Sequence, residues 1–375
     1  MSAELGVAVV GVGADQWSGA AHLPALAATE GVRLARLVTS SPESAARAEE
    51  AYGVPASASL DDALADPAVQ LVTVTVRVSK HREIAETAIR AGKHLYCEWP
   101  LGADVAETQA LADLSAQHPE QIHVVGLQGR LAPEICAASS AITAGRIGQP
   151  LRANLQVFLP QGLVPRPKHR AHLRHRSAAA NVLSIQGGHS LDMMVALLGE
   201  PGPVHHAVLW SAVDYFTVLE TGERLARDAP DNLVAQLEIG GIPVTVQLSQ
   251  TSTRPGSSIE ILGTQASLLV TARDQPQFSA LRAVITDIDG SSQELQPLDA
   301  AAGVELPRDH AGFNVAIAYR NILGAIAGRI PRDAVPTLTR AVTMQQLLDS
   351  IEELAERAAT PSARSSEPNS AALAL

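Results

Sequence analysis

The stretch Gly6–Trp17, "GVAVVGVGADQW", decides the fold, because a short β-branched strand runs directly into glycines there. An alanine-rich helical pattern follows over residues 20–31. Residues 33–130 continue the alternation of strand, polar turn and helix. Strands that alternate with helices of this length predict right-handed crossovers and a parallel, doubly wound sheet. We therefore expect an α/β protein in which residues 1–130 form a Rossmann dinucleotide-binding domain.

Length, composition and charge exclude several classes of protein. A chain of 375 residues with 46% hydrophobic content can bury a sizeable core and is expected to split into two domains. The formal net charge of -11 argues against a basic surface for nucleic acid. The two cysteines, Cys97 and Cys136, lack the spacing of a disulfide framework or a cysteine zinc site. No basic leader and no apolar run of about 18 residues occurs. We expect a soluble cytoplasmic protein without a nucleic-acid or membrane partner.

The chain changes character after residue 130. Segments such as "VAQLEIGGIPVTVQLS" and "LRAVITDIDGSSQ" alternate apolar and polar residues and turn at Gly-Gly or Asp-Gly. They predict a large, open, mostly antiparallel sheet in an α+β substrate and oligomerisation domain over residues 131–358. Helical patterns accompany the strands near residues 178–198, 309–328 and 337–358. The small, polar tail over 359–375 is predicted to be disordered.

The glycine turn after the first strand is typical of a nucleotide site. Gly11 and Gly13 let the backbone approach a pyrophosphate, whose charge then meets free N–H groups at the start of a helix. Gln16 stands where a third glycine is expected, which predicts a longer or more open loop before Gly19. The alternative is an ordinary tight turn, and the repeated strand–helix units favour the nucleotide site over it.

The end of the second predicted strand bears on the choice of cofactor. NAD-specific sites hold the ribose there with a carboxylate. We expect no carboxylate at that corner, because Thr39, Ser40 and Ser41 occupy it, with Arg47 about one helical turn beyond. Hydroxyls and an arginine can accept a 2′-phosphate. We therefore expect NADP in preference to NAD.

The motifs "VAVVGVG", "SKHREIAETAIRAGKHLYCEWP" and "IQGGHSLDMMVALLG" resemble those of the Gfo/Idh/MocA oxidoreductase family, in the branch that contains the fungal galactose-pathway repressor. The resemblance covers residues 1–358. It implies hydride transfer between a pyridine nucleotide and a sugar or polyol carbon. It also implies a cofactor site made by Gly11, Gly13, Ala14, Asp15, Gln16, Trp17, Thr39, Ser40, Ser41, Arg47, Val76, Val78, His81, Glu98, Trp99, Pro100 and Gln128.

The resemblance implies a catalytic lysine, aspartate and histidine, and this chain lacks two of them. Trp99 stands at the lysine and Ile185 at the aspartate, whereas His189 is kept, with Asp192 three residues later. Trp99 only donates a hydrogen bond and cannot shuttle a proton. We interpret it as packing beside a nicotinamide or sugar ring, the alternative being that it fills the space of the lysine. His189 is the predicted proton donor, the alternative being a hydrogen-bonded interior histidine. Pro100 is a candidate for a cis peptide bond.

Residues 164–177, "VPRPKHRAHLRHRS", form a strongly basic segment of an acidic chain. Lys168 and His172 are catalytic candidates, because either one can return the missing base. The arginines can bind a carboxylate or phosphate if the segment lines the ligand cavity. The alternatives are a solvated loop and a contact with an acidic subunit surface. The His-x-x-His-x-x-His spacing lacks a nearby cysteine or acidic ligand, so no metal site is predicted.

Three functions follow from these features. The favoured one is an NAD(P)-dependent oxidoreductase for a sugar-like or other small molecule, anionic ones included, with His189 as proton donor and Lys168 or His172 assisting. The second is a nucleotide-binding sensor that recognises another protein without turnover. The third, an assembly protein without a ligand, is disfavoured by the intact glycine turn. We expect a homodimer or homotetramer, since an open sheet face needs cover.

Overall fold

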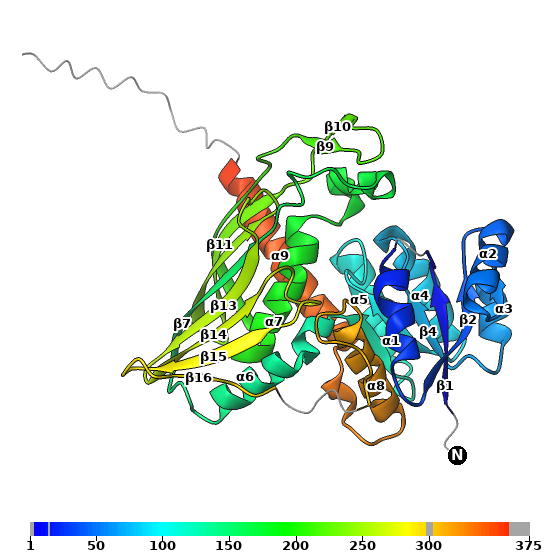
Figure 1. The fold of residues 1–375 in the computed structure, drawn as a ribbon, viewed down its shortest axis with the longest axis horizontal. Helices are drawn as coiled ribbons and strands as arrows, with labels where there is room; N and C mark the ends of the chain where they lie inside the picture. The colour runs from blue at the N-terminus through cyan, green and yellow to red at the C-terminus, as the bar shows by residue number, and fades with distance from the viewer. Residues whose placement is uncertain (1–3, 14–15, 298–302, 360–375) are drawn as a thin grey trace, which may run out of the picture.

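The computed structural model describes residues 4–13, 16–297 and 303–359, and these residues contain two large sheets and one two-stranded sheet (Figure 1). The N-terminal sheet is parallel and has the strand order β3-β2-β1-β4-β5-β6. The strand order reverses between β1 and β4, and ligands bind beyond the carboxyl ends of the strands at such a point. The strands are β1 (Leu5–Val10), β2 (Val32–Val38), β3 (Ala56–Ser57), β4 (Leu71–Val74), β5 (His94–Glu98) and β6 (His123–Gly126). The predicted doubly wound parallel sheet is confirmed.

Some helices of this domain begin at side chains that cap their free N–H groups. The Ser41 hydroxyl accepts from the Ser44 N–H, and the Asp104 carboxylate accepts from the Glu107 N–H. The helical elements are the π-helical turn η1 (Ser18–His22), α1 (Leu23–Ala27), α2 (Pro42–Tyr52), α3 (Leu60–Ala65), the 3₁₀ turn η2 (Val78–Lys80), α4 (His81–Arg90), α5 (Val105–Ala116) and the 3₁₀ turn η3 (Gln128–Leu131). The next helix, α6 (Pro133–Thr143), packs against the second domain. Alternate residues along β1 enter two different hydrophobic clusters, so both faces of the sheet are buried.

The second sheet has eight strands in the order β16-β15-β14-β13-β7-β12-β11-β8. Its neighbours are antiparallel except for the parallel pair β7 and β12, as the mostly antiparallel prediction requires. The strands are β7 (Pro150–Phe158), β8 (Pro201–Trp210), β11 (Asn232–Ile239), β12 (Ile242–Ser249), β13 (Gly256–Gly263), β14 (Ala266–Ala272), β15 (Arg282–Asp287) and β16 (Ser292–Glu294). A short hairpin, β9 (Tyr215–Thr217) and β10 (Arg224–Ala226), projects from this domain (Figure 1).

Three long helices follow the predicted ranges closely. They are α7 (Gly188–Leu198), which continues the π-helical turn η6 (Val182–Gly187), α8 (Phe313–Ile326) and α9 (Leu338–Ala359). Helices α7 and α9 lie between the eight-stranded sheet and the Rossmann domain (Figure 1). Helix α8 lies far beyond residue 130 in the chain, yet it packs on the Rossmann sheet in one cluster with Val7, Val9 and Tyr96. The domain boundary at residue 130 therefore stays a prediction. Helix α8 departs from it, because α8 lies beyond residue 130 but packs on the Rossmann sheet.

The outer face of the eight-stranded sheet carries partly exposed apolar side chains. Val208 and Trp210 on β8 and Leu269 on β14 are each about two-fifths exposed, whereas their neighbours Ala207 and Leu268 are buried. This is the kind of face for which we expected subunit contacts, and association stays a prediction. None of the helices among the described residues is long and apolar enough to span a bilayer. Residues 360–375 of the tail that we expected to be disordered lie outside the described part of the chain.

Candidate active site

A cavity of about 760 Å³ lies between the carboxyl ends of the Rossmann strands and the second domain. Both domains line it, which is where open α/β folds place their ligands. Of the predicted cofactor residues, those that line it are Gln16, Trp17, Val76, Val78, His81, Glu98, Trp99, Pro100 and Gln128. His189 and His172 line it as well, so the structure brings most of the predicted site together. Ala14 and Asp15 lie outside the described residues.

The glycine turn fits a nucleotide, because its backbone leaves no room for side chains. Gly11 has a φ of +94°, and a Cβ on it would lie 2.5 Å from Cγ1 of Val76. The Gly13 N–H donates to the Ser18 hydroxyl over 3.2 Å at the start of η1. His81 holds the neighbouring wall, with Nδ1 2.8 Å from the Pro100 carbonyl oxygen and Nε2 3.0 Å from the Val76 carbonyl oxygen. These residues form a rigid backbone wall of the kind that a pyridine nucleotide requires.

The corner after β2 differs from the expectation of hydroxyls and an arginine alone. The Thr39 hydroxyl donates to the Ser41 carbonyl, and the Ser41 hydroxyl serves as the cap of α2. Glu43 lies in the first turn of α2, and its pKa is lowered by a backbone hydrogen bond, by the Ser41 side chain and by Arg47. The assumption that this corner lacks a carboxylate was therefore wrong. Ser40 and Arg47 are exposed, and none of Thr39, Ser40, Ser41 and Arg47 lines the cavity.

Trp99 is buried against the π-helical turn η6. Its indole N–H donates to the Ser184 carbonyl oxygen over 2.7 Å. A Cβ on Gly188 would lie 2.2 Å from the indole nitrogen, so glycine is required where α7 begins. The Trp99–Pro100 peptide bond is cis, as the sequence suggested. Trp99 thus lines the cavity, while its polar atom is already bonded to a neighbouring element.

His189 lies on the cavity wall in a buried setting. Burial lowers its pKa to about 4, against a smaller opposing effect of Glu98, so the ring is neutral at pH 7. Its Nδ1 has no hydrogen-bond partner among the described residues. The nearby Asp192 accepts instead from Arg130, over 2.9 Å, and burial raises the Asp192 pKa to about 6. A neutral imidazole holds no extra proton to release, which argues against the predicted role of proton donor.

Glu98 joins a buried polar network that crosses the two parts of the chain. Its carboxylate oxygen lies 2.9 Å from Nε2 of His22, and Nδ1 of His22 lies 2.8 Å from the Tyr319 hydroxyl on α8. Thr73 on β4 completes the chain, 3.0 Å from the same hydroxyl. Glu98 is therefore held in place by α8 rather than being a free base at the cavity.

Several uncharged polar side chains on the cavity wall carry atoms that have no hydrogen-bond partner. Within the described ranges, Oε1 of Gln128, both amide atoms of Gln186 and Oε1 of Gln277 are buried and unpaired, as is Nε1 of Trp17. Buried polar groups are usually paired, so unpaired ones on a cavity wall suit a bound molecule. Sequence analysis had not identified Gln186 and Gln277 as site residues, because a single glutamine in a helix or loop carries no motif.

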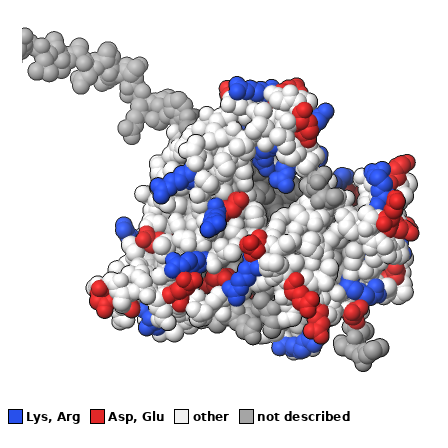
Figure 2. Space-filling model, in the orientation of Figure 1, with Lys and Arg blue, Asp and Glu red and all other residues white. Residues whose placement is uncertain are grey.

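The basic segment is divided by the fold. Its 3₁₀ turns, η4 (Lys168–Arg174) and η5 (Arg176–Ala178), direct only some of its side chains into the cavity, and the basic ones are Arg166, His169, Arg170, His172 and His175. Lys168 is exposed and outside the lining, and its backbone N–H donates to Glu220. Its position therefore speaks against the predicted role as a substitute base. Over the face in Figure 2, Lys and Arg alternate with Asp and Glu.

His172 is placed better than Lys168 but is also a weak base. It lines the cavity, and burial lowers its pKa, with Arg77, His169 and Arg166 lowering it further. Its Nδ1 lies 3.0 Å from the His169 carbonyl oxygen. In the described ranges, no group of three or more His, Cys, Asp or Glu side chains is placed to hold a metal ion.

Two family models match the chain. "Oxidoreductase family, NAD-binding Rossmann fold" matches residues 5–125, and "GFO/IDH/MocA C-terminal domain" matches residues 135–269. Dehydrogenase aclE of Aspergillus oryzae is 34% identical over 264 residues, which cover 66% of this chain and 70% of that protein. The galactose/lactose metabolism regulatory protein GAL80 of Kluyveromyces lactis is 26% identical over 191 residues, which cover 47% of this chain and 42% of that protein.

Solved structures agree on the fold. A super-repressor mutant of Gal80p from Saccharomyces cerevisiae has a TM-score of 0.83 at 17% identity, covering 95% of this chain and 97% of that one. Levoglucosan dehydrogenase, in complex with NADH and levoglucosan, has a TM-score of 0.80 at 21% identity, covering 94% and 98%. Identities this low show the shared fold. Both domain models and the dehydrogenase relative together show that the chain belongs to the Gfo/Idh/MocA oxidoreductase family, with galactose-pathway regulators among its relatives.

Proposed function

We propose that the protein is a pyridine-nucleotide-dependent oxidoreductase that acts on a sugar-like or other small molecule in this cavity. The observation that carries the proposal is the set of buried, unpaired polar atoms on Gln128, Gln186 and His189 in the wall of this cavity. A bound nucleotide and substrate would supply the missing hydrogen bonds. When bound, the nucleotide supplies the hydride chemistry.

Residues of this chain would bind the nucleotide, orient the substrate and accept a proton from it. Gly11, Gly13, Val76 and Pro100 would hold the nucleotide against the carboxyl ends of β1, β4 and β5. Neutral His189 would accept the hydroxyl proton during oxidation, since its pKa of about 4 leaves it without a proton to donate at pH 7.

For the cofactor, we propose NAD ahead of NADP. The Glu43 carboxylate at the corner after β2 supports it, because a carboxylate repels a 2′-phosphate and can hold a ribose hydroxyl. The capping role of Ser41 also leaves fewer hydroxyls free for a phosphate than the sequence suggested.

A regulator that binds the nucleotide without turnover is the second candidate. Trp99 replaces the family lysine and its N–H is bonded to Ser184, while Ile185 replaces the aspartate on the same wall. Neither position offers a base. The regulators among the relatives support this candidate at the level of the family.

A titration of the purified protein separates the two candidates. Binding of NADH and NADPH is followed by quenching of tryptophan emission. Turnover is followed by reduced-nicotinamide absorbance, which rises when NAD⁺ or NADP⁺ oxidises a sugar and falls when NADH or NADPH reduces a keto acid or an imine. We expect NADH to bind more tightly, and His189→Gln to lower turnover about 100-fold while Lys168→Gln leaves it unchanged. Tight binding without turnover of any panel member favours the regulator, and absence of binding contradicts both candidates.

A further inference from the structure

Three arginines line the second-domain side of the cavity: Arg166, Arg170 and Arg227. The acidic residues on the described lining are Glu98 and Asp274. Glu98 is bonded to His22, and a carboxylate oxygen of Asp274 accepts from the Gln275 N–H. Neither carboxylate is paired with an arginine of the cavity. These two carboxylates therefore do not balance the charges of the three arginines.

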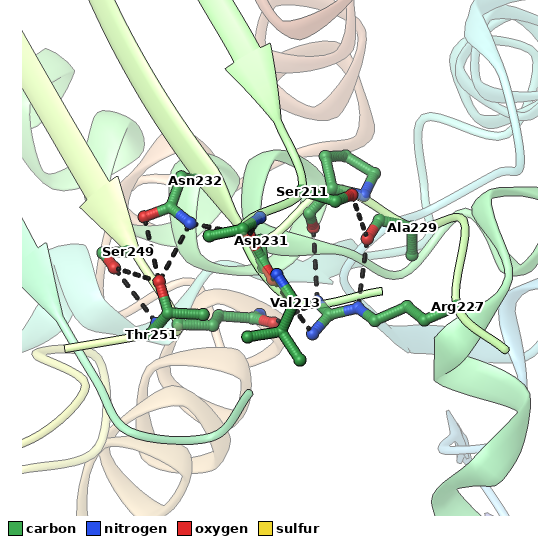
Figure 3. A network of polar contacts seen from close by, with 11 residues as sticks. Ser211, Val213, Arg227, Ala229, Asp231, Asn232, Ser249 and Thr251 are labelled. Carbon is green, nitrogen blue, oxygen red and sulfur yellow. Dashed lines mark hydrogen bonds and ion pairs between the residues drawn. The ribbon is translucent and has the colours of Figure 1, made fainter. Parts of the chain in front are cut away.

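The charge of Arg227 is balanced by Asp231 within a network of polar contacts (Figure 3). Its Nε donates to the Ala229 carbonyl over 3.0 Å, one terminal nitrogen donates to Gln250 over 2.9 Å, and the other lies 3.4 Å from Asp231. Asp231 is fully buried and also accepts from the Ala212 and Val213 N–H groups. Arg227 is therefore a structural cation whose charge is balanced within the domain.

Arg166 has no such balance. Its backbone pairs with Thr217, but its guanidinium makes no hydrogen bond or ion pair with any described residue. It is partly buried, and burial together with Arg170 and Arg227 lowers its pKa to about 10. The Arg170 guanidinium is likewise unpaired within the described chain, and it is exposed. Unpaired charge in a partly buried place is unfavourable unless an anion offsets it.

We infer that Arg166 and Arg170 bind an anionic group of the substrate, a carboxylate or a phosphate, on the second-domain side of the cavity. The inference rests on the proposed function, because it names the substrate class of the same cavity. Two guanidinium forks match the oxygens of such a group. The unpaired glutamines and His189 would then meet an uncharged, hydroxyl-bearing part of the same molecule.

The same segment provides a matched control. Arg176 is exposed, lies outside the lining, and is 2.6 Å from Glu356 and 3.4 Å from Glu352. Removing its charge changes the net charge of the protein as much as removing that of Arg166. A difference between the two variants therefore reports the site and not the overall charge.

The test is calorimetric titration of the full-length protein, saturated with NADH, with inorganic phosphate and with malonate at constant ionic strength. NADH keeps the probes from the glycine turn. We expect at least one anion to bind, Arg166→Gln and Arg170→Gln each to weaken it about 10-fold or more, and Arg176→Gln to leave it unchanged. Arg170→Gln changes an exposed side chain and so decides the matter if Arg166→Gln does not fold. The probe that binds identifies the group as phosphate or carboxylate.

Two results overturn the inference: neither anion binds the wild-type protein, or Arg176→Gln weakens binding as much as Arg166→Gln and Arg170→Gln do. The NADH affinity of each variant is measured first and should equal that of wild type. If wild type fails to bind NADH, the proposed function fails on its own. The anion titration is then repeated without nucleotide, and the same comparison of variants still decides the inference.

Discussion

The indole of Trp99 occupies the space that any side chain at Gly188 would need, since a Cβ there would lie 2.2 Å from the indole nitrogen. Helix α7 can approach β5 this closely only because residue 188 has no side chain. The Trp99 indole and the start of helix α7 at Gly188 therefore form one packing unit. His189 follows directly in the chain, so this unit fixes its position on the cavity wall.

Gly188→Ala should lower the free energy of unfolding by about 1–3 kcal/mol, because the Cβ overpacks against a buried ring. Urea unfolding measures it. Gly187→Ala is the control, since its Cβ would meet only the ends of Leu183 and Leu248 at 3.3 Å. Trp99→Leu should rescue Gly188→Ala in a double-mutant cycle. Additive effects in that cycle would show that the ring and the glycine are not coupled.

Gly11→Ala should weaken NADH binding about 10-fold or more, because the Cβ would press on Val76 at the cofactor wall. Fluorescence titration measures the affinity. Gly92→Ala separates space from backbone strain, since Gly92 has a φ of +79° and no atom within 4 Å of its Cβ position. That control should lower stability while leaving NADH affinity intact. Equal affinity in Gly11→Ala and wild type would contradict the nucleotide site.

Tyr319→Phe should cost about 1–3 kcal/mol, because it leaves His22 and Thr73 without their shared hydroxyl in a buried network. Thermal or urea unfolding checks it. Tyr96→Phe is the comparison, since Tyr96 is also fully buried and its hydroxyl interacts with Glu98 but makes no hydrogen bond to His22, Thr73 or Tyr319. If both variants lose the same stability, the network does not tie α8 to the Rossmann domain.

His189 and Asp192 should give opposite pH dependences of stability. The folded pKa of His189, about 4, lies below its ordinary 6.5, so the unfolded chain binds a proton there between these values and stability rises with pH. The folded pKa of Asp192, about 6, lies above its ordinary 3.8, so the folded chain keeps a proton there and stability falls as pH rises.

Between pH 4 and 6, the free energy of unfolding of Asp192→Asn should therefore increase with pH more steeply than that of wild type. The free energy of unfolding of His189→Gln should increase less steeply. Each slope should differ from the wild-type slope by about 1 kcal/mol per pH unit. Urea unfolding at several pH values measures both slopes. Comparison with wild type cancels the groups that all three proteins share. Slopes that match wild type in both variants would show that neither group is perturbed by burial.

The predictions that the structure confirmed depend on sequence patterns among neighbouring residues. The alternation of strands and helices over residues 33–130 follows from backbone periodicity, which is visible in neighbouring residues. Gly11 and the cis candidate Pro100 are positions where the residue type itself restricts the backbone. The helix predicted over 178–198 begins at Val182 because Asn181 caps it, a detail that sets the boundary by four residues.

The structure differs from other predictions at positions where the direction of a side chain decides its role. Lys168 looked like a replacement base, but the 3₁₀ turn leaves it exposed and outside the cavity lining while Arg166 lines the cavity. The corner after β2 looked free of carboxylates, but Glu43 lies at the start of α2 beside Ser41. Spacing along a basic or polar segment does not say which side chains a turn directs inward.

The sequence by itself determined the family and the two large sheets, because these depend on residue identity and local periodicity. Tertiary structure alone decided that Gly188 makes room for Trp99, that α8 returns to hold Glu98 through His22, and that Arg227 is neutralised whereas Arg166 is not. The physical reason is that burial and pairing are set by residues distant in the chain, and the charge of a group depends on both.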